Sequence, residues 1–198
     1  MLEYAHGVSR GIIRDRPSQL SRIGLDFKEH INHEIMEYHP TVEKIKNLLK
    51  EHSCWFETFE HEPVRTSEEA AKMRTGYTLE QGAKTIIARA KEPGTGRKFV
   101  MFVMPGNRKF DADKIKSHIG LVDIRFATEQ EVSEITSGTL PGGVPPFGNI
   151  FNLEVFADKA LFDNEKIVFN AGDKSYSIGM KSSDYKKVVD PVVADICQ

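Results

Sequence analysis

The sequence predicts a mixed α/β domain of the α+β type, with a largely antiparallel sheet and a helical arm at its N-terminus. From residue 53 onward, short β-prone runs alternate with short helical runs. Most connections between these runs are too short to hold crossover helices, so neighbouring strands are expected to pair antiparallel. The 198 residues are enough for one such domain and an appendage.

Residues 1–39 differ from the rest and are predicted to form an N-terminal helical extension, followed by a domain over residues 40–198. Apolar side chains recur at spacings of three and four between Leu20 and Tyr38, which indicates a helix. Pro40 interrupts it, and Thr41 begins a second helix. We expect the arm to pack on the domain or on a second copy of the chain as a homodimer contact.

The elements of the domain follow from caps, turns and strand propensity. Thr66 with Glu69 is expected to form a capping box for a helix that ends at Met73, and residues 128–131 a second box. Asp111 is expected to cap a short helix. A Gly/Pro-rich turn at 92–96 predicts a hairpin. The predicted strands are 54–60, 84–90, 98–104, 122–127, 150–156, 166–170 and 176–180, and the last helix is 182–189.

Composition excludes several classes of protein. The net charge is −2, whereas proteins that bind long duplexes through many phosphates are usually strongly basic, so any nucleic-acid contact should be short and local. No apolar run approaches the roughly 18 residues of a membrane span, and no membrane partner is predicted. Cys54 and Cys197 are far apart and predict no disulfide framework, which favours a reducing, cytoplasmic setting.

The most unusual segment is the loop at residues 140–148, LPGGVPPFG. Its glycines allow positive φ and close approach to a ligand, while its prolines stiffen the frame. The amides of Gly142, Gly143 and Val144 could form an oxyanion hole. A tight surface turn is the alternative, and composition alone favours that alternative.

Lys84 and His61 are further candidates for chemistry. Lys84 begins an apolar strand on the side of Ile86 and Ala88, so its ammonium could lie at a pocket rim, although strand-end lysines are commonly only solvated. His61 could be a general base or a solvated residue of a turn before Pro63.

Two other signals predict no chemistry. Cys54 is expected to be a small residue of a core strand rather than a nucleophile. His30 and His33 lack a third ligand, so neither a metal nor another cofactor is predicted.

Taken in order, three motifs resemble the YbaK-type aminoacyl-tRNA deacylase family, which includes the editing (insertion) domain of bacterial prolyl-tRNA synthetases. They are residues 58–63 (TFEHEP), 83–87 (AKTII) and 142–148 (GGVPPFG). Residues 155–161 and 167–172 resemble the closing strand pair of the family. The likeness spans roughly residues 42–190 and leaves the arm outside.

The resemblance implies a twisted, barrel-like sheet flanked by helices, with a pocket for the aminoacylated 3′-terminal adenosine of a tRNA. It also implies hydrolysis of mischarged tRNA, mostly tRNA(Pro) that carries a small non-cognate amino acid. By the same resemblance, Lys84 matches the pocket lysine, and Gly142, Gly143 and Val144 belong to the G-x-x-x-P loop. The expected substrate-binding residues are Phe59, His61, Thr85, Pro146, Asp158, Asn170 and Gly172.

The chemistry fits this assignment because an aminoacyl ester is already activated and needs no covalent nucleophile. A positioned water and donors for the oxyanion suffice. Lys84 would repel the α-ammonium of the substrate, so we assign it to the terminal phosphate or the ribose. A basic patch for the acceptor stem, or a solvated strand face, is expected from Arg89, Lys91, Arg97, Lys98, Arg108 and Lys109.

Two departures from the family pattern leave the amino acid open. Phe59 stands where members that act on cysteinyl esters tend to have Tyr, and Thr85 stands where some alanine-editing members have Asn. Two other functions also stay open. One is an inactive module that recruits tRNA or an aminoacyl-tRNA synthetase through the arm, and the other is a hydrolase of a different small ester or thioester.

Overall fold

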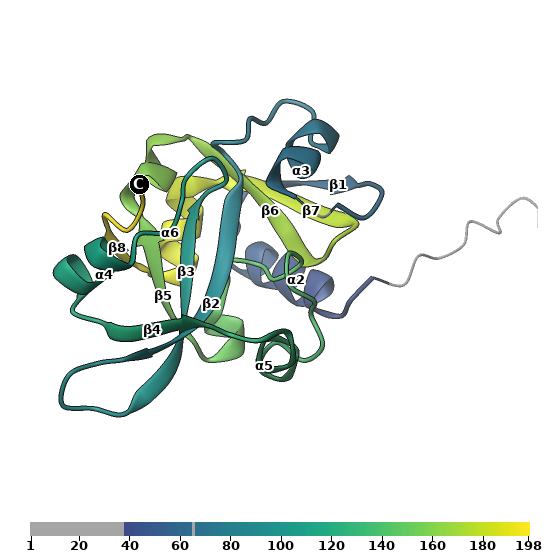
Figure 1. Cartoon of the computed structure of the whole chain (residues 1–198). Coiled ribbons are helices and arrows are strands. Elements are labelled where there is room, and N and C mark those ends of the chain that lie inside the picture. The colour runs from purple at the N-terminus through teal and green to yellow at the C-terminus, as the bar shows by residue number, and fades with distance from the viewer. Residues whose placement is uncertain (1–37, 65) are drawn as a thin grey trace, which may run out of the picture. The chain divides into compact units, whose positions relative to one another are not determined.

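The computed structural model describes residues 38–64 and 66–198 (Figure 1). The predicted arm therefore lies outside the described residues, apart from its last two positions. Within the described ranges, no helix has the length and apolar character that crossing a membrane requires.

The strands form two sheets. The smaller sheet has the order β1-β7-β6, with both pairs antiparallel. The larger has the order β4-β2-β3-β5-β8, in which β3, β5 and β8 run parallel and the other pairs antiparallel. The bounds are β1 Phe56–Glu60, β2 Ala83–Lys91, β3 Arg97–Pro105, β4 Val122–Phe126, β5 Glu154–Asp158, β6 Lys166–Asp173, β7 Tyr176–Lys181 and β8 Val192–Ala194.

These pairings confirm the mixed α/β class with largely antiparallel strands, but the described strands do not close into a barrel. A single bridge between Gly82 and Val168 links the start of β2 to β6 of the smaller sheet. This junction between the two sheets is where the candidate site forms.

The helices confirm the predicted caps. Thr66 and Thr128 each form a capping box with a glutamate three residues on, and Asp111 caps the helix that follows it. The helices are α2 Thr41–Glu51, α3 Ser67–Met73, α4 Ala112–Ile119, α5 Glu129–Ile135 and α6 Ser182–Val189, with 3₁₀ turns at Gly148–Phe151 and Lys159–Asp163.

Three details differ from the predicted elements. The strand expected from residue 54 begins at Phe56, so Cys54 precedes it and is only partly buried. The strand expected from residue 150 begins only at Glu154, because a 3₁₀ turn occupies Gly148–Phe151. Strand β8 was not predicted, since three residues with exposed Val192 and Val193 carry too little alternation to indicate a strand.

The core occupies both faces of the larger sheet. Between the sheets, Ile87 and Met101 belong to a cluster that also contains Phe169 of β6. On the opposite face, Ala88 and Phe102 pack in a second cluster with Ile115 of α4, and Figure 1 shows α4 on that side. Because successive β2 side chains point alternately into these two clusters, the directions of its first side chains are fixed as well.

Candidate active site

A cavity of about 200 Å³ lies at the start of β2, next to the bridge between the sheets. Helix α3, the segment before β2, the Gly/Pro loop and β6 all contribute walls. Five of the predicted site residues line it although they are far apart in the sequence: Lys84, Thr85, Gly142, Val144 and Asn170. Other wall residues are Ser67, Ala70, Arg74, Leu79 and Phe169.

Lys84 lies on the face of β2 that its sequence position predicts, the face of Ile86 and Ala88. Its Nζ donates a hydrogen bond to the carbonyl oxygen of Arg108 at 2.7 Å. Partial burial lowers the pKa of this ammonium. Lys84 makes no ion pair with a carboxylate in the described part of the chain.

The Gly/Pro loop begins with a turn that explains its first glycine. Pro141 and Gly142 are the central residues, Gly142 has φ +86°, and the amide of Gly143 donates to the carbonyl oxygen of Leu140 at 2.9 Å. These are the features of a type II turn. The amide of Gly143 therefore already has an acceptor in this turn, and its part in an oxyanion hole stays a prediction. The amides of Gly142 and Val144 have no hydrogen-bond acceptor within residues 38–64 and 66–198.

Strand β6 holds this loop in place. Asn170 Nδ2 donates to the carbonyl oxygen of Gly142 at 2.7 Å, and the amide of Gly172 donates to that of Gly143 at 2.9 Å. Gly172 has φ +103°, and a Cβ there would lie 2.6 Å from Cβ of Thr41. Gly172 thus positions the loop and is not a wall of the cavity, whereas Asn170 does both.

Arg74 is a wall residue that the sequence did not single out. It follows α3 directly and is only 6% exposed. Its Nη2 donates to Asn170 Oδ1 at 2.6 Å and its Nε to Ser177 Oγ at 3.0 Å. Burial lowers the pKa of Arg74 to about 10, which leaves it cationic at neutral pH. The only hint in the sequence is its spacing of four from Ala70, which many snorkelling arginines share.

His61 and Phe59 lie behind the cavity wall and do not line it. His61 Nε2 lies 2.8 Å from Ser177 Oγ, and its Nδ1 lies 2.9 Å from the carbonyl oxygen of Glu62. Phe59 is paired with Ser177 across β1 and β7 and packs edge-on against Tyr77, with ring centroids 5.7 Å apart. Both residues therefore lie next to Ser177, which hydrogen-bonds to the wall residues Arg74 and Asn170, and neither is itself a wall residue.

The hydroxyl of Thr85 is unusual among the described residues. Its Oγ1 is the one buried side-chain oxygen or nitrogen there without a hydrogen-bond partner. Thr85, Gly142 and Val144 also line a second cavity of about 230 Å³, whose other walls include Ile87 and Phe126. A buried unpaired hydroxyl is unfavourable, so Thr85 is a point at which the wall shared by the two cavities departs from ordinary packing.

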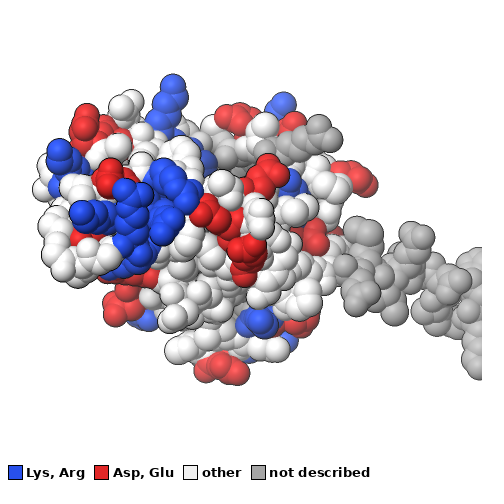
Figure 2. Space-filling model, turned by 60° about the horizontal axis from the view of Figure 1, so that its bottom comes forward, with Lys and Arg blue, Asp and Glu red and all other residues white. Residues whose placement is uncertain are grey.

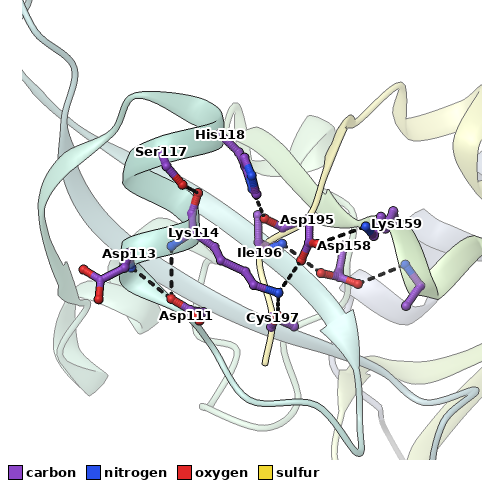
Figure 3. Close-up of polar contacts among 11 residues, drawn as sticks. Asp111, Asp113, Lys114, Ser117, His118, Asp158, Lys159, Asp195, Ile196 and Cys197 are labelled. Carbon is purple, nitrogen blue, oxygen red and sulfur yellow. Dashed lines mark hydrogen bonds and ion pairs between the residues drawn. The ribbon is translucent and has the colours of Figure 1, made fainter.

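Asp158 and Pro146 lie elsewhere, so the structure does not bring them to the cavity that the other predicted residues form. The buried carboxylate of Asp158 accepts from the amides of Ala160 and Ile196, each at 2.9 Å (Figure 3). It thereby anchors the C-terminal segment. The carbonyl oxygen of Pro146 accepts from the hydroxyl of buried Tyr185 at 2.8 Å, which supports the loop from behind.

The basic residues expected to form one patch lie in separate groups. Cross-strand register pairs Lys91 with Arg97 and Arg89 with Phe99, so the three cations share one face of the β2–β3 hairpin. Arg125 of β4, opposite Arg89, joins them, but it pairs with Glu131 at 2.6 Å. With the bottom of the molecule turned forward, Figure 2 shows lysine and arginine side chains gathered there beside acidic ones.

The remaining basic residues lie apart from that hairpin face. Lys98 faces the other way, opposite Ala90, and pairs with Glu92 and Glu154. Arg108 and Lys109 follow β3 next to Lys84, whose ammonium contacts the Arg108 carbonyl.

Neither cysteine has the character of a nucleophile. Cys54 is partly buried, which raises its pKa, and buried Cys197 has a pKa raised to about 12 by desolvation and Asp158. Within the described residues, no cluster of three or more His, Cys, Asp or Glu side chains is placed to hold a metal ion. His30 and His33 lie outside those residues.

Comparison with known proteins fits this site. A family described as the aminoacyl-tRNA editing domain matches residues 61–188. The multifunctional Ser/Thr-tRNA deacylase ProXp-y of Escherichia coli (strain K12) is 32% identical over 152 residues, which cover 76% of this chain and 89% of that protein. The proline–tRNA ligase of Ralstonia pickettii (strain 12J) is 29% identical over 59% of this chain, which spans only 20% of the ligase.

The fold has solved counterparts. A crystal structure of a candidate trans-editing enzyme for prolyl tRNA synthetase superposes with a TM-score of 0.68. The match covers 82% of this chain and 99% of that one at 23% identity, so it supports the fold alone. The sequence match over most of the domain carries the assignment: this chain belongs to the aminoacyl-tRNA editing domain family.

Proposed function

We propose that this protein is a trans-acting aminoacyl-tRNA deacylase, which hydrolyses the ester between a mis-attached amino acid and the 3′ end of a tRNA. The observation that carries the proposal is the cavity at the start of β2, which gathers Lys84, the unpaired Thr85 hydroxyl and the Gly142 turn. Its walls come from distant segments of a chain whose match covers 89% of a relative named a Ser/Thr-tRNA deacylase.

The size of the cavity favours a small amino acid. Pockets for drug-sized ligands are typically about 300–1,000 Å³, and this one is about 200 Å³. Ala70, Val144 and Phe169 give it apolar walls, while Thr85 and Asn170 add polar ones. Serine and threonine are the first candidates because the bacterial relative is named for them. The ligases favour tRNA(Pro) as the carrier.

The reaction needs a positioned water and donors for the oxyanion. Water attacks the ester carbonyl, whose oxygen becomes negative, and the intermediate collapses with release of the ribose hydroxyl. The free amides of Gly142 and Val144 are the loop donors that remain for this oxygen. Lys84 would repel the α-ammonium, so we place its ammonium toward the terminal phosphate or the ribose.

A deacylation panel tests the proposal. Ser-, Thr-, Ala-, Cys- and Pro-tRNA(Pro) would each be incubated with the full chain, and release of the amino acid measured against a no-enzyme control. We expect hydrolysis of at least one misacylated species, with Pro-tRNA(Pro) spared. Binding of tRNA without turnover of any ester would contradict the proposal and favour an inactive recruiting module. Turnover of small esters irrespective of tRNA would favour the alternative function, a hydrolase of a different small ester or thioester.

We place the protein in the cytoplasm, where aminoacyl-tRNA is made. We also propose that the predicted arm is an accessory binding segment. Residues 1–39 would bind tRNA, a synthetase or a second copy of the chain. A chain that begins at residue 38, compared with the full chain in sedimentation and tRNA binding, tests this role. Equal mass and equal affinity for the two chains would contradict it.

A further inference from the structure

Arg74 is a buried cation without an anionic partner. Its residue exposure is 6%, and no carboxylate lies within ion-pair distance of it in the described part of the chain. The acceptors of its hydrogen bonds, Asn170 and Ser177, are both neutral. Burying a guanidinium without an anionic partner is unfavourable, which makes Arg74 in the cavity wall a candidate functional residue.

The guanidinium has more donors than the protein uses. Arginine carries five N–H donors, and Arg74 directs one to Ser177 and one to Asn170. Ser177 Oγ also donates a hydrogen bond to Asn170 Oδ1 at 3.0 Å, so the two acceptors are bonded to each other. The guanidinium plane is thereby fixed at the cavity, and its remaining donors are available to an oxygen of a ligand.

The charge of the substrate changes during hydrolysis in a way that suits a fixed cation. The α-ammonium of the amino acid keeps its charge throughout, so its repulsion by Arg74 is the same in the ground state and in the transition state. In the transition state, negative charge develops on the carbonyl oxygen and is attracted by it. A group whose interaction improves along this path accelerates the reaction. Such a donor would also replace the Gly143 amide, which the turn engages.

We propose that Arg74 is a catalytic residue whose guanidinium donates to the ester carbonyl oxygen as that oxygen becomes negative, held by Asn170 and Ser177. The inference rests on the proposed ester hydrolysis. Water forms the new C–O bond, and the carbonyl π electrons move to the oxygen that Arg74 stabilises. The bond to the ribose oxygen then breaks, and a proton from the water passes to that oxygen. Nothing is oxidised or reduced.

The test compares Arg74→Met with Arg74→Lys and with Lys72→Met, which removes an exposed cation from the helix that Arg74 follows. Rates would be measured at saturation on the best ester of the panel, and on the same amino acid esterified to adenosine without any phosphate. We expect Arg74→Met to lower kcat about 100-fold or more on both substrates, with little change in KM. Lys72→Met should leave kcat unchanged, and Arg74→Lys should recover only part of it.

Chemical rescue keeps the proposal falsifiable if Arg74→Met proves unstable. Millimolar methylguanidinium added to folded Arg74→Ala should raise kcat and leave Lys84→Ala unaffected. If the wild type hydrolyses no ester, the proposed function itself fails. If the wild type is active, an unchanged kcat in folded Arg74→Met overturns the inference. A loss confined to KM, or absent on the phosphate-free ester, would also overturn it and place Arg74 on the terminal phosphate.

Discussion

Two charged regions of this protein use their cations in opposite ways. At the C-terminal segment, Lys114 and Lys159 both pair with Asp195, at 2.8 and 2.9 Å (Figure 3). In the cavity, Arg74 and Lys84 bond only to neutral oxygens. In the first region each cation is paired with a carboxylate, whereas in the second neither cation is, although Arg74 is buried and Lys84 half-buried.

The two regions differ in whether their cations are available to a ligand. Balanced surface pairs hold a segment in place and each contributes little. Unbalanced cations in a cavity oppose folding and remain available to a ligand, which is how functional sites commonly depart from local stability rules. We therefore expect changes in the cavity to affect activity, and changes at the C-terminal segment to affect stability.

Lys84→Ala should lower kcat/KM for deacylation about 10- to 100-fold, because it removes a preorganised positive charge from the cavity. The melting temperature should change little, since the half-buried ammonium makes one hydrogen bond and no ion pair. Lys159→Ala is the control, because it also removes a cation but one that Asp195 balances. Equal losses in the two variants would contradict the comparison.

Gly142→Ala and Gly120→Ala form a matched pair, because the two glycines have φ +86° and +82°. A Cβ at Gly142 would lie 3.6 Å from Lys174 Cε, and one at Gly120 would meet nothing within 4 Å. Each change should lower the free energy of unfolding by about 1 kcal/mol through backbone strain. Only Gly142→Ala should also lower kcat/KM, by about tenfold, because it shifts a loop donor. Deacylation that falls equally in both would mean that strain alone is responsible.

Thr85→Val should raise the free energy of unfolding by about 1 kcal/mol, because it removes a buried hydroxyl that has no partner in the described structure. Deacylation should fall several-fold if the substrate supplies that partner. Denaturant unfolding and steady-state rates on one sample measure both effects. A variant that is both less stable and fully active would show that the hydroxyl is satisfied within the protein.

Asp195→Asn should leave deacylation unchanged and alter only acid stability. Lys114 and Lys159 lower the pKa of Asp195 from 3.8 to about 2. Because the folded-state pKa is depressed, the stabilisation is present above the unfolded value and is lost as pH falls through the folded one. The melting temperature of the wild type should thus fall as the pH is lowered from 4 to 2, and that of Asp195→Asn should fall less. Parallel curves for the two proteins would contradict this role.

Local signals in the sequence were sufficient for most elements of the fold. The capping boxes at Thr66 and Thr128 and the β2–β3 hairpin depend on contacts within a few residues, and all were predicted. The division into two sheets depends on long-range pairing, which short patterns do not encode. The barrel-like sheet was implied by resemblance, and the observed pairing differs.

The site was predictable only where a motif marks it. Lys84 and the Gly142 loop carry such motifs and line the cavity. Arg74 carries none, since its meaning depends on the distant partners Asn170 and Ser177. Asp158 was expected to bind substrate by resemblance, and the sequence did not show that its carboxylate accepts from the amides of Ala160 and Ile196, because Ile196 belongs to the distant C-terminal segment.

The most direct test of the comparison is to locate the bound substrate. Isotope-labelled wild-type protein would be titrated with a non-hydrolysable analogue, seryl-adenosine joined by an amide in place of the ester, and followed by NMR. If the cavity binds the substrate, the largest chemical-shift changes should fall on the amides of Thr85 and Gly142 and on the Nε–H of Arg74, with Lys114 and Asp195 unaffected. Changes centred on Lys114 and Asp195, with the cavity silent, would contradict it.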